Sequence, residues 1–175
     1  MLKIAYSPIY KLDLPEGHRF PMEKYELLPE QLLYEGTVSS VNFFEPNSLE
    51  KKWILNTHDA TYFDKLIILD LSKSEIRKTG FPLSKELIDR EIHIMQGSIE
   101  ASLFALEHGI AMNIAGGTHH AFTNRGEGFC LLNDIAISAN YLLENQLAKK
   151  VLVVDLDVHQ GNGTAQIFEN KEDVF

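Results

Sequence analysis

Residues 151–163 read VLVVDLDVHQGNG, an apolar run that passes directly into acidic and imidazole side chains. A run that is apolar at every position is typical of a strand buried on both faces of a parallel sheet. Residues two apart on an extended strand share a face, so we expect Asp155, Asp157 and His159 to project together. Two neighbouring carboxylates in a partly dry crevice repel each other unless a cation or a proton lies between them. The segment therefore predicts a metal-binding or acid–base site at the end of a strand.

A second polar cluster follows another apolar segment. IAMNIA (110–115) is typical of a buried strand and leads into a long loop that starts with GGTHH (116–120), which places His119 beside His120. Alone, the DxDxH pattern also fits a charged loop, and a histidine pair is more often structural. In parallel sheets ligands bind beyond the carboxyl ends of the strands, where both clusters lie. Their coincidence at one edge favours a shared functional site.

The rest of the chain alternates strand and helix patterns. Residues 83–108 carry apolar side chains at 88, 92, 95, 99, 103 and 106, which form one stripe on a helix. We also expect strands at 2–6, 39–46 and 151–157, a strand beginning at 174–175, and helices at about 21–34, 48–55, 58–69, 133–147 and 164–170, with Pro29 breaking or restarting the first helix. Apolar strands separated by helices predict a three-layer α/β/α fold with a mostly parallel sheet.

Composition limits the classes of function. The 175 residues are 45% hydrophobic, which suits one domain with one core. The formal net charge of −9 argues against direct nucleic-acid binding, which needs clustered Lys and Arg. Cys130 is the only cysteine, so no internal disulfide can form, and we expect it to be a small buried residue. No stretch approaches the ~20 apolar residues of a membrane span, and we expect a cytoplasmic protein.

Three other site classes fit the sequence less well. GNG (161–163) resembles the start of a dinucleotide fingerprint, but Gln166 occupies the position of its third glycine. A binuclear manganese hydrolase of the arginase type would have an Asp two residues after His159, where this sequence has Gly161. A serine hydrolase needs G-x-S-x-G, which does not occur. One ion, zinc or another first-row divalent metal, is favoured by Asp and His donors.

Two long motifs resemble the zinc-dependent histone deacetylase family, including its bacterial members. They are GGTHHAFTNRGEGFCLLND (116–134) and VVDLDVHQGNGTAQIF (153–168), and Gln160 makes the second most similar to the class IV branch. Three shorter segments are similar as well: YSPIY, HRFPMEKY and NTHDATYFDKL. The resemblance implies an arginase/deacetylase-like fold and hydrolysis of the amide of acetyl-lysine.

The resemblance also implies a set of metal ligands. The family residues that match Asp157 and His159 ligate Zn2+, and a K+ ion binds near the backbone of this turn, so Asp155, Asp157 and His159 are candidates for that ion too. The third zinc ligand, an Asp, and a Tyr that donates to the oxyanion come from later segments that this sequence lacks. We therefore expect residues 1–175 to be the N-terminal part of a single deacetylase catalytic domain, incomplete at the C-terminus and poorly active alone.

In the family, the two matching histidines act on the attacking water. The resemblance implies that Asp155 orients His119 and that Asn162 orients His120. It further implies that His120 is the general base and then the acid, while His119 with Asp155 supplies positive charge and orientation. Asn162 replaces the Asp of class I and holds the ring without a negative charge.

The remaining implications concern the substrate and the sheet edges. Gly128 and Phe129 match the pair that lines the acyl-lysine channel, and residues 18–25 are expected to border its entrance. The expected partner is an acetylated lysine on a protein or an acetylated small amine. An acetylpolyamine or longer-chain acyl-lysine amidohydrolase, or a non-catalytic binding module in this truncated form, remains an alternative. The family sheet places two strands between those matching 110–115 and 151–157, so we expect open edges covered by an oligomer or by the missing half.

Overall fold

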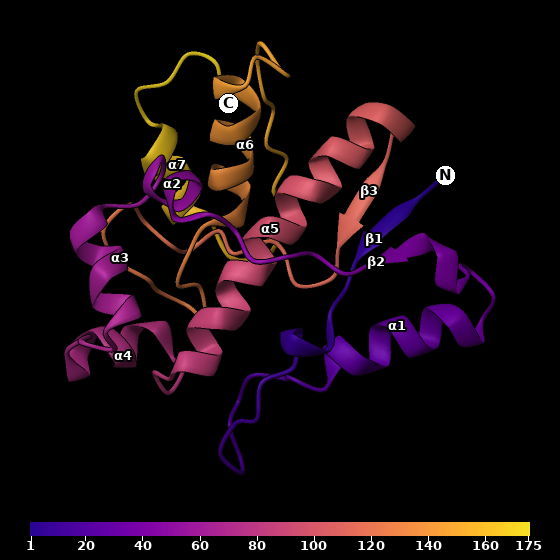
Figure 1. The fold of residues 1–175 in the computed structure, drawn as a ribbon. Helices are drawn as coiled ribbons and strands as arrows, with labels where there is room; N and C mark the ends of the chain where they lie inside the picture. The colour runs from indigo at the N-terminus through magenta and orange to yellow at the C-terminus, as the bar shows by residue number, and fades with distance from the viewer.

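The computed structural model describes residues 1–175 as an α/β fold built on a short parallel sheet (Figure 1). The sheet has the order β2-β1-β3, with β1 at Lys3–Ala5, β2 at Phe43–Phe44 and β3 at Ala111–Asn113. In this register Ile4 lies opposite both Phe43 and Met112. The predicted parallel α/β class is confirmed.

Helices make up the rest of the regular secondary structure (Figure 1). The predicted helices are present with shifted ends, and residues 39–46 form only a short 3-10 helix followed by β2. The bounds are α1 Lys24–Tyr34, α2 Lys51–Leu55, α3 Ala60–Ile67, α4 Lys73–Thr79, α5 Lys85–His108, α6 Asp134–Glu144 and α7 Asn162–Phe168, with 3-10 helices η1 Pro8–Tyr10 and η2 Ser40–Asn42. No helix combines the length and the apolar composition needed to cross a membrane.

The long helix α5 packs against the sheet and organises the core. Ser84 caps its first turn by accepting a hydrogen bond from the Leu87 backbone N–H at 3.1 Å. Gly97 lies at a close approach of the helix to the sheet, because a Cβ there would meet the Tyr10 hydroxyl and lie 3.3 Å from the Ala5 Cβ. Only glycine permits this approach without displacing a neighbour.

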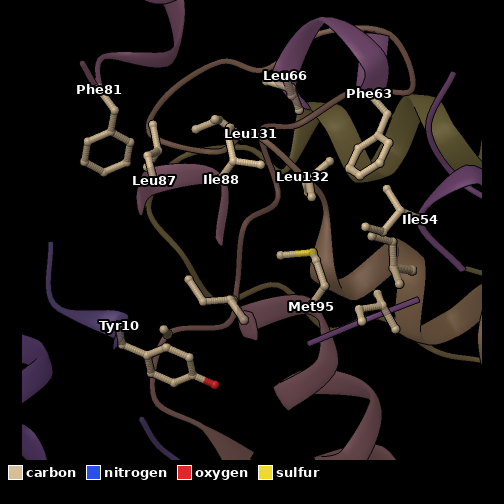
Figure 2. Close-up of a cluster of buried hydrophobic side chains, with 14 of the residues drawn as sticks. Tyr10, Ile54, Phe63, Leu66, Phe81, Leu87, Ile88, Met95, Leu131 and Leu132 are labelled. Atoms are coloured by element: carbon tan, nitrogen blue, oxygen red, sulfur yellow. The ribbon is translucent and has the colours of Figure 1, made fainter. Parts of the chain in front are cut away.

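The main hydrophobic core joins α5 to α2, α3 and the loop before α6. Leu131 and Leu132, from that loop, have no exposed surface and pack beside Met95 and Leu66 (Figure 2). Large buried apolar side chains contribute about 1.5–3 kcal/mol each, so these two leucines anchor the loop firmly. The loop that carries the histidines is thus held to the core at its C-terminal end.

The strand predicted at 151–157 does not form. Val151 makes a single parallel bridge to Val174, while Leu152, Val154 and Leu156 are 65%, 68% and 91% exposed. A cavity of about 430 Å³ separates this segment from β3. Isolated extended segments gain little without a neighbour to share ladder hydrogen bonds, which explains the difference. β3 is accordingly an edge strand, and the prediction that residues 110–115 form a buried strand is wrong because Met112 is 54% exposed.

Two other predictions differ from the structure. Helix α1 continues through Pro29, which therefore costs one intrahelical hydrogen bond without ending the helix. Helix α4 has no counterpart among the predicted elements. Ser72 caps it by accepting from the Glu75 N–H, and the Glu75 carboxylate accepts in turn from the Ser72 N–H, so a capping box starts this helix.

Candidate active site

Asp134 fixes the loop that carries the two adjacent histidines. It begins α6 and is 3% exposed. Its Oδ1 accepts from the Thr118 N–H and hydroxyl, both at 2.7 Å, and from the Gly117 N–H at 3.0 Å, while Oδ2 accepts from the Ser98 hydroxyl at 2.5 Å. A buried carboxylate is stable only when its lone pairs are used in this way. The start of the loop is therefore rigid.

His119 is oriented by a carboxylate. Its Nδ1 lies 2.6 Å from Asp155 Oδ2, and the ring is almost fully buried. The His119 ring and the Asp157 backbone N–H, in that order, lower the pKa of Asp155. Because an ionised carboxylate only accepts, Nδ1 carries the proton and donates. The His119 Nε2 makes no hydrogen bond in the structure.

His120 is oriented by an amide. Its Nδ1 lies 2.7 Å from Asn162 Oδ1, and the same oxygen accepts from the Gly163 N–H at 3.0 Å. The Gly163 contact identifies this atom as the amide oxygen, so the His120 Nδ1 donates to it. The two histidine rings lie 4.2 Å apart between centroids. Both rings thus have Nδ1 engaged and Nε2 without a partner.

Asp157 and His159 form a second pair nearby. The His159 Nδ1 lies 3.0 Å from Asp157 Oδ1, and the His159 ring centroid is 6.0 Å from that of His120. Hydrogen bonds from the His159 backbone N–H and then from its ring lower the pKa of Asp157. These residues do not share a strand face with Asp155, whose side chain contacts His119 instead. The prediction that the three side chains project together is wrong because residues 151–157 form no strand.

The Asp157–His159 pair suits two ligands of one divalent ion. His159 Nδ1 and Asp157 Oδ1, the two atoms that share this hydrogen bond, would hold the ion once the ring releases its Nδ1 proton. No group of three His, Cys, Asp or Glu side chains in residues 1–175 converges on a common point. The pair therefore fits part of a zinc site, and residues 1–175 supply no third ligand.

Four of these six residues, all but Asp155 and Asn162, line one cavity together with the expected channel pair. The cavity has a volume of about 530 Å³, and its lining includes His119, His120, Asp157, His159, Gly128 and Phe129. The channel pair has an unusual backbone, with φ of 53° at Gly128 and 65° at Phe129. A Cβ at residue 128 would lie 2.6 Å from the His120 Cδ2, so glycine is required for the ring to pack there. Phe129 holds a conformation that non-glycine residues rarely adopt, a form of strain that clusters at functional sites.

Aromatic rings surround Phe129 on the cavity wall. Its ring centroid lies 5.0 Å from that of Phe20 and 5.2 Å from that of Phe81, and the Arg19 guanidinium lies 4.8 Å from the ring. Arg19, Phe20, Lys24 and Tyr25 line the same cavity, as expected for a segment at the entrance. Such a wall offers apolar surface to an alkyl chain beside the polar cluster.

Cys130 also reaches this cavity but has the properties of a core residue. Its side chain is buried, and burial raises the pKa of the thiol to about 12. A thiol that stays protonated is a poor nucleophile. The geometry therefore favours water activated by imidazole over a cysteine nucleophile.

Comparison with known proteins identifies the family. Residues 18–175 match the histone deacetylase domain. The chain belongs to the histone deacetylase family. A 41% identical relative, an uncharacterized protein of Picosynechococcus sp., matches over 98% of this chain and 57% of its own length. Histone deacetylase 2 of Arabidopsis thaliana and the acetoin utilization protein AcuC of Staphylococcus aureus are each 28% identical, over 44% and 42% of their lengths.

Solved structures of the same family share the fold. The crystal structure of a histone deacetylase homolog from Aquifex aeolicus matches 99% of this chain and 49% of that chain, with a TM-score of 0.83 and 24% identity. A second structure, of a homolog complexed with SAHA, matches with a TM-score of 0.84. The chain spans about half the length of the relatives it matches. This family membership agrees with the resemblance carried by the two long motifs.

Some residues around the site had no assigned role in the sequence analysis. Asp134 was placed only at the start of the helix expected at 133–147, and nothing predicted a role for His58 or Thr164. Asp134 could have been found from the signal of an acidic residue at the start of a helix that follows a glycine-rich loop. His58 lies 75 residues from its partner Asn133, so no local pattern reveals that contact.

Proposed function

We propose that residues 1–175 are the N-terminal part of a single catalytic domain that hydrolyses the amide of acetyl-lysine with the help of Zn2+. The observation that carries the proposal is that each of the two histidines has its Nδ1 hydrogen-bonded to a side-chain partner. Asp155 and Asn162 hold their Nδ1 atoms, which leaves both Nε2 atoms available to a water molecule. The cavity that contains these rings also contains Asp157 and His159.

Asp157 and His159 would hold the zinc ion, together with a third ligand from outside residues 1–175. A bound zinc ion lowers the pKa of a coordinated water toward ~7 and polarises a carbonyl oxygen. The turn at Asp155–His159 is also a candidate site for the K+ ion of the family. Because the ligand set is incomplete here, we expect residues 1–175 to have little activity without the segment that completes it.

The two histidines would divide the proton transfers. His120 would accept a proton from the attacking water through Nε2 and return it to the departing lysine amine. His119 would stabilise negative charge on the reacting centre, since the Asp155 carboxylate compensates positive charge on its ring. The neutral Asn162 would keep His120 in position without adding charge.

The substrate would enter along the aromatic wall. Phe129 and Phe20 present apolar surface to the methylene groups of an acyl-lysine side chain. An acetylated lysine on a protein is the favoured substrate, with an acetylated small amine, an acetylpolyamine or a longer acyl-lysine as alternatives. Gln160 in the turn supports a branch similar to class IV.

Metal dependence tests this function directly. The complete domain should release acetate from an acetyl-lysine peptide, lose the activity in a chelator and regain it with added Zn2+. Asp157→Asn should lower the rate at least 10-fold, whereas Asp64→Asn should not, because Asp64 has a similar side-chain exposure (57% against 51%) but lies outside the cavity. Activity that survives chelation, or an equal loss in the two variants, would overturn the proposal.

A non-catalytic binding module is the second candidate for residues 1–175 by themselves, favoured by the absence of a third metal ligand among them. Such a module would bind the acetyl-lysine peptide without releasing acetate. Measuring peptide binding and acetate release on the same preparation separates the two candidates.

A further inference from the structure

Three buried polar residues outside the candidate active site connect the segments that carry its histidines. His58, Asn133 and Thr164 are 2%, 0% and 7% exposed, and they come from the loop before α3, the residue before α6 and α7. Buried polar groups need partners, so their hydrogen bonds are expected to be specific and costly to remove.

His58 joins the middle of the histidine loop (residues 116–133) to its C-terminal end. Its Nε2 accepts from the Asn133 N–H at 3.0 Å, so its Nδ1 carries the proton and donates to the Phe122 carbonyl at 3.0 Å. Next to it, the Asp59 N–H donates to the Thr123 carbonyl at 2.9 Å. Burial lowers the pKa of His58 to about 4, which keeps the ring neutral and able to make both contacts.

Asn133 carries the connection from the loop to α7. Its side-chain amide donates to the Ala121 carbonyl at 2.9 Å and to the Thr164 hydroxyl at 3.0 Å. The Thr164 N–H donates to the His119 carbonyl at 3.1 Å. Thr164 lies two residues after Asn162 on α7, so this helix holds the His119 backbone and the His120 ring together.

We propose that His58, Asn133 and Thr164 are positioning residues for the His119–His120 pair, acting as a buried hydrogen-bond relay that sets the spacing between the histidine loop and α7. The inference rests on the proposed function of the pair. The spacing matters because His120 belongs to the loop, whereas its partner Asn162 belongs to α7. A shift between these two segments would break the Nδ1 hydrogen bond that fixes the ring.

Thr164 gives the sharpest test, because its methyl and hydroxyl groups can be removed separately. Thr164→Val keeps the shape and removes the hydroxyl, whereas Thr164→Ser keeps the hydroxyl and removes the methyl. The relay predicts a roughly 10- to 100-fold fall in kcat with little change in KM for Thr164→Val in the complete domain, and a smaller fall for Thr164→Ser. A role in packing alone predicts the opposite order.

Nitrogen NMR of the histidine rings gives a readout that does not depend on activity. We expect the neutral His120 ring of residues 1–175 to carry its proton on Nδ1, the atom that faces Asn162 Oδ1. His58→Phe should give His120 a mixture of tautomers. His93→Phe is the matched control, because His93 also contacts a carbonyl, that of Asp89 in its own helix, but has no link to the loop.

The outcomes separate this inference from the function on which it rests. If the wild type releases acetate and Thr164→Ser is slower than Thr164→Val, the relay is overturned but the proposed function is not. Unchanged His120 signals in His58→Phe would also overturn it, and would do so even if Thr164→Val failed to fold. A tautomer change in His58→Phe without acetate release by the wild type would support the relay and overturn the proposed deacetylase.

Discussion

Each histidine of the candidate active site owes its orientation to one side-chain partner. His119 contacts Asp155 and His120 contacts Asn162, both through Nδ1. The DxDxH and HH spacings nominated His119, His120 and Asp155 from the sequence, whereas Asn162 and the pairing of partners came only from the family resemblance. The backbone supports from Asn133 and His58 were not predictable, because these residues act through contacts between segments distant in the chain. Only the fold brings such partners together.

The buried His58 predicts a specific dependence of stability on pH. Its pKa is about 4 in the folded chain and 6.5 in an unfolded one, so below pH 6.5 the unfolded state binds a proton that the folded state does not. The stabilising contribution is complete above pH 6.5 and is lost as pH falls toward 4. Between pH 7.5 and 5, the free energy of unfolding should fall by about 2 kcal/mol more in the wild type than in His58→Gln. Urea unfolding at both pH values measures this, and parallel losses in the two proteins would contradict it.

At the scale of the elements, periodicity and caps predicted the helices better than they predicted the strands. The stripe of residues 83–108 corresponds to α5, and the helix expected at 133–147 corresponds to α6, which Asn133 caps. The capping-box pattern of Ser72 and Glu75 was present in the sequence but was not used, so α4 was missed. A helix makes most of its backbone hydrogen bonds internally, whereas a strand needs a neighbouring strand to make them. Residues 151–157 have a strand-like sequence but no such neighbour, which is why they were mistaken for a strand.

The contact between α5 and the sheet predicts the effect of a methyl group at Gly97. Alanine would favour the helix by up to about 1 kcal/mol, but its Cβ would overlap the buried Tyr10 hydroxyl and lie 3.0 Å from the Asn113 amide nitrogen. Overpacking of this kind costs about 1–3 kcal/mol, so Gly97→Ala should be less stable by about 1 kcal/mol. Gln96→Ala, one residue away, should change the free energy of unfolding by no more than about 0.5 kcal/mol. A Gly97→Ala chain that melts above the wild type would show that the helix and sheet can separate.

At the scale of the whole molecule, the open side of the sheet is the main structural feature to explain. The β3 edge, the cavity of about 430 Å³ and the exposed residues Leu152 and Val154 lie together along this side. The two strands expected between 110–115 and 151–157 would belong here, and the matched relatives are about twice as long as this chain. We propose that this side is covered in the complete protein by the remainder of the domain or by another chain.

The open side predicts self-association of residues 1–175. Exposed strand edges and apolar side chains promote association at μM–mM concentrations, so oligomers should be detectable by sedimentation at roughly 100 μM. Leu152→Thr with Val154→Thr should reduce association without a large loss of stability, since both side chains are mostly exposed. Leu27→Thr with Leu28→Thr on α1, at 59% and 46% exposure, is the matched control. A monomeric wild type, or equal effects of the two double variants, would contradict this explanation.

The central claim, that His120 transfers protons during amide hydrolysis, is tested most directly by the rate of acetate release from an acetyl-lysine peptide. In the complete zinc-loaded domain we expect His120→Ala to lower kcat by about 10²–10⁴-fold and His93→Ala to leave it nearly unchanged. A His120→Ala domain that is as fast as the wild type would contradict the account.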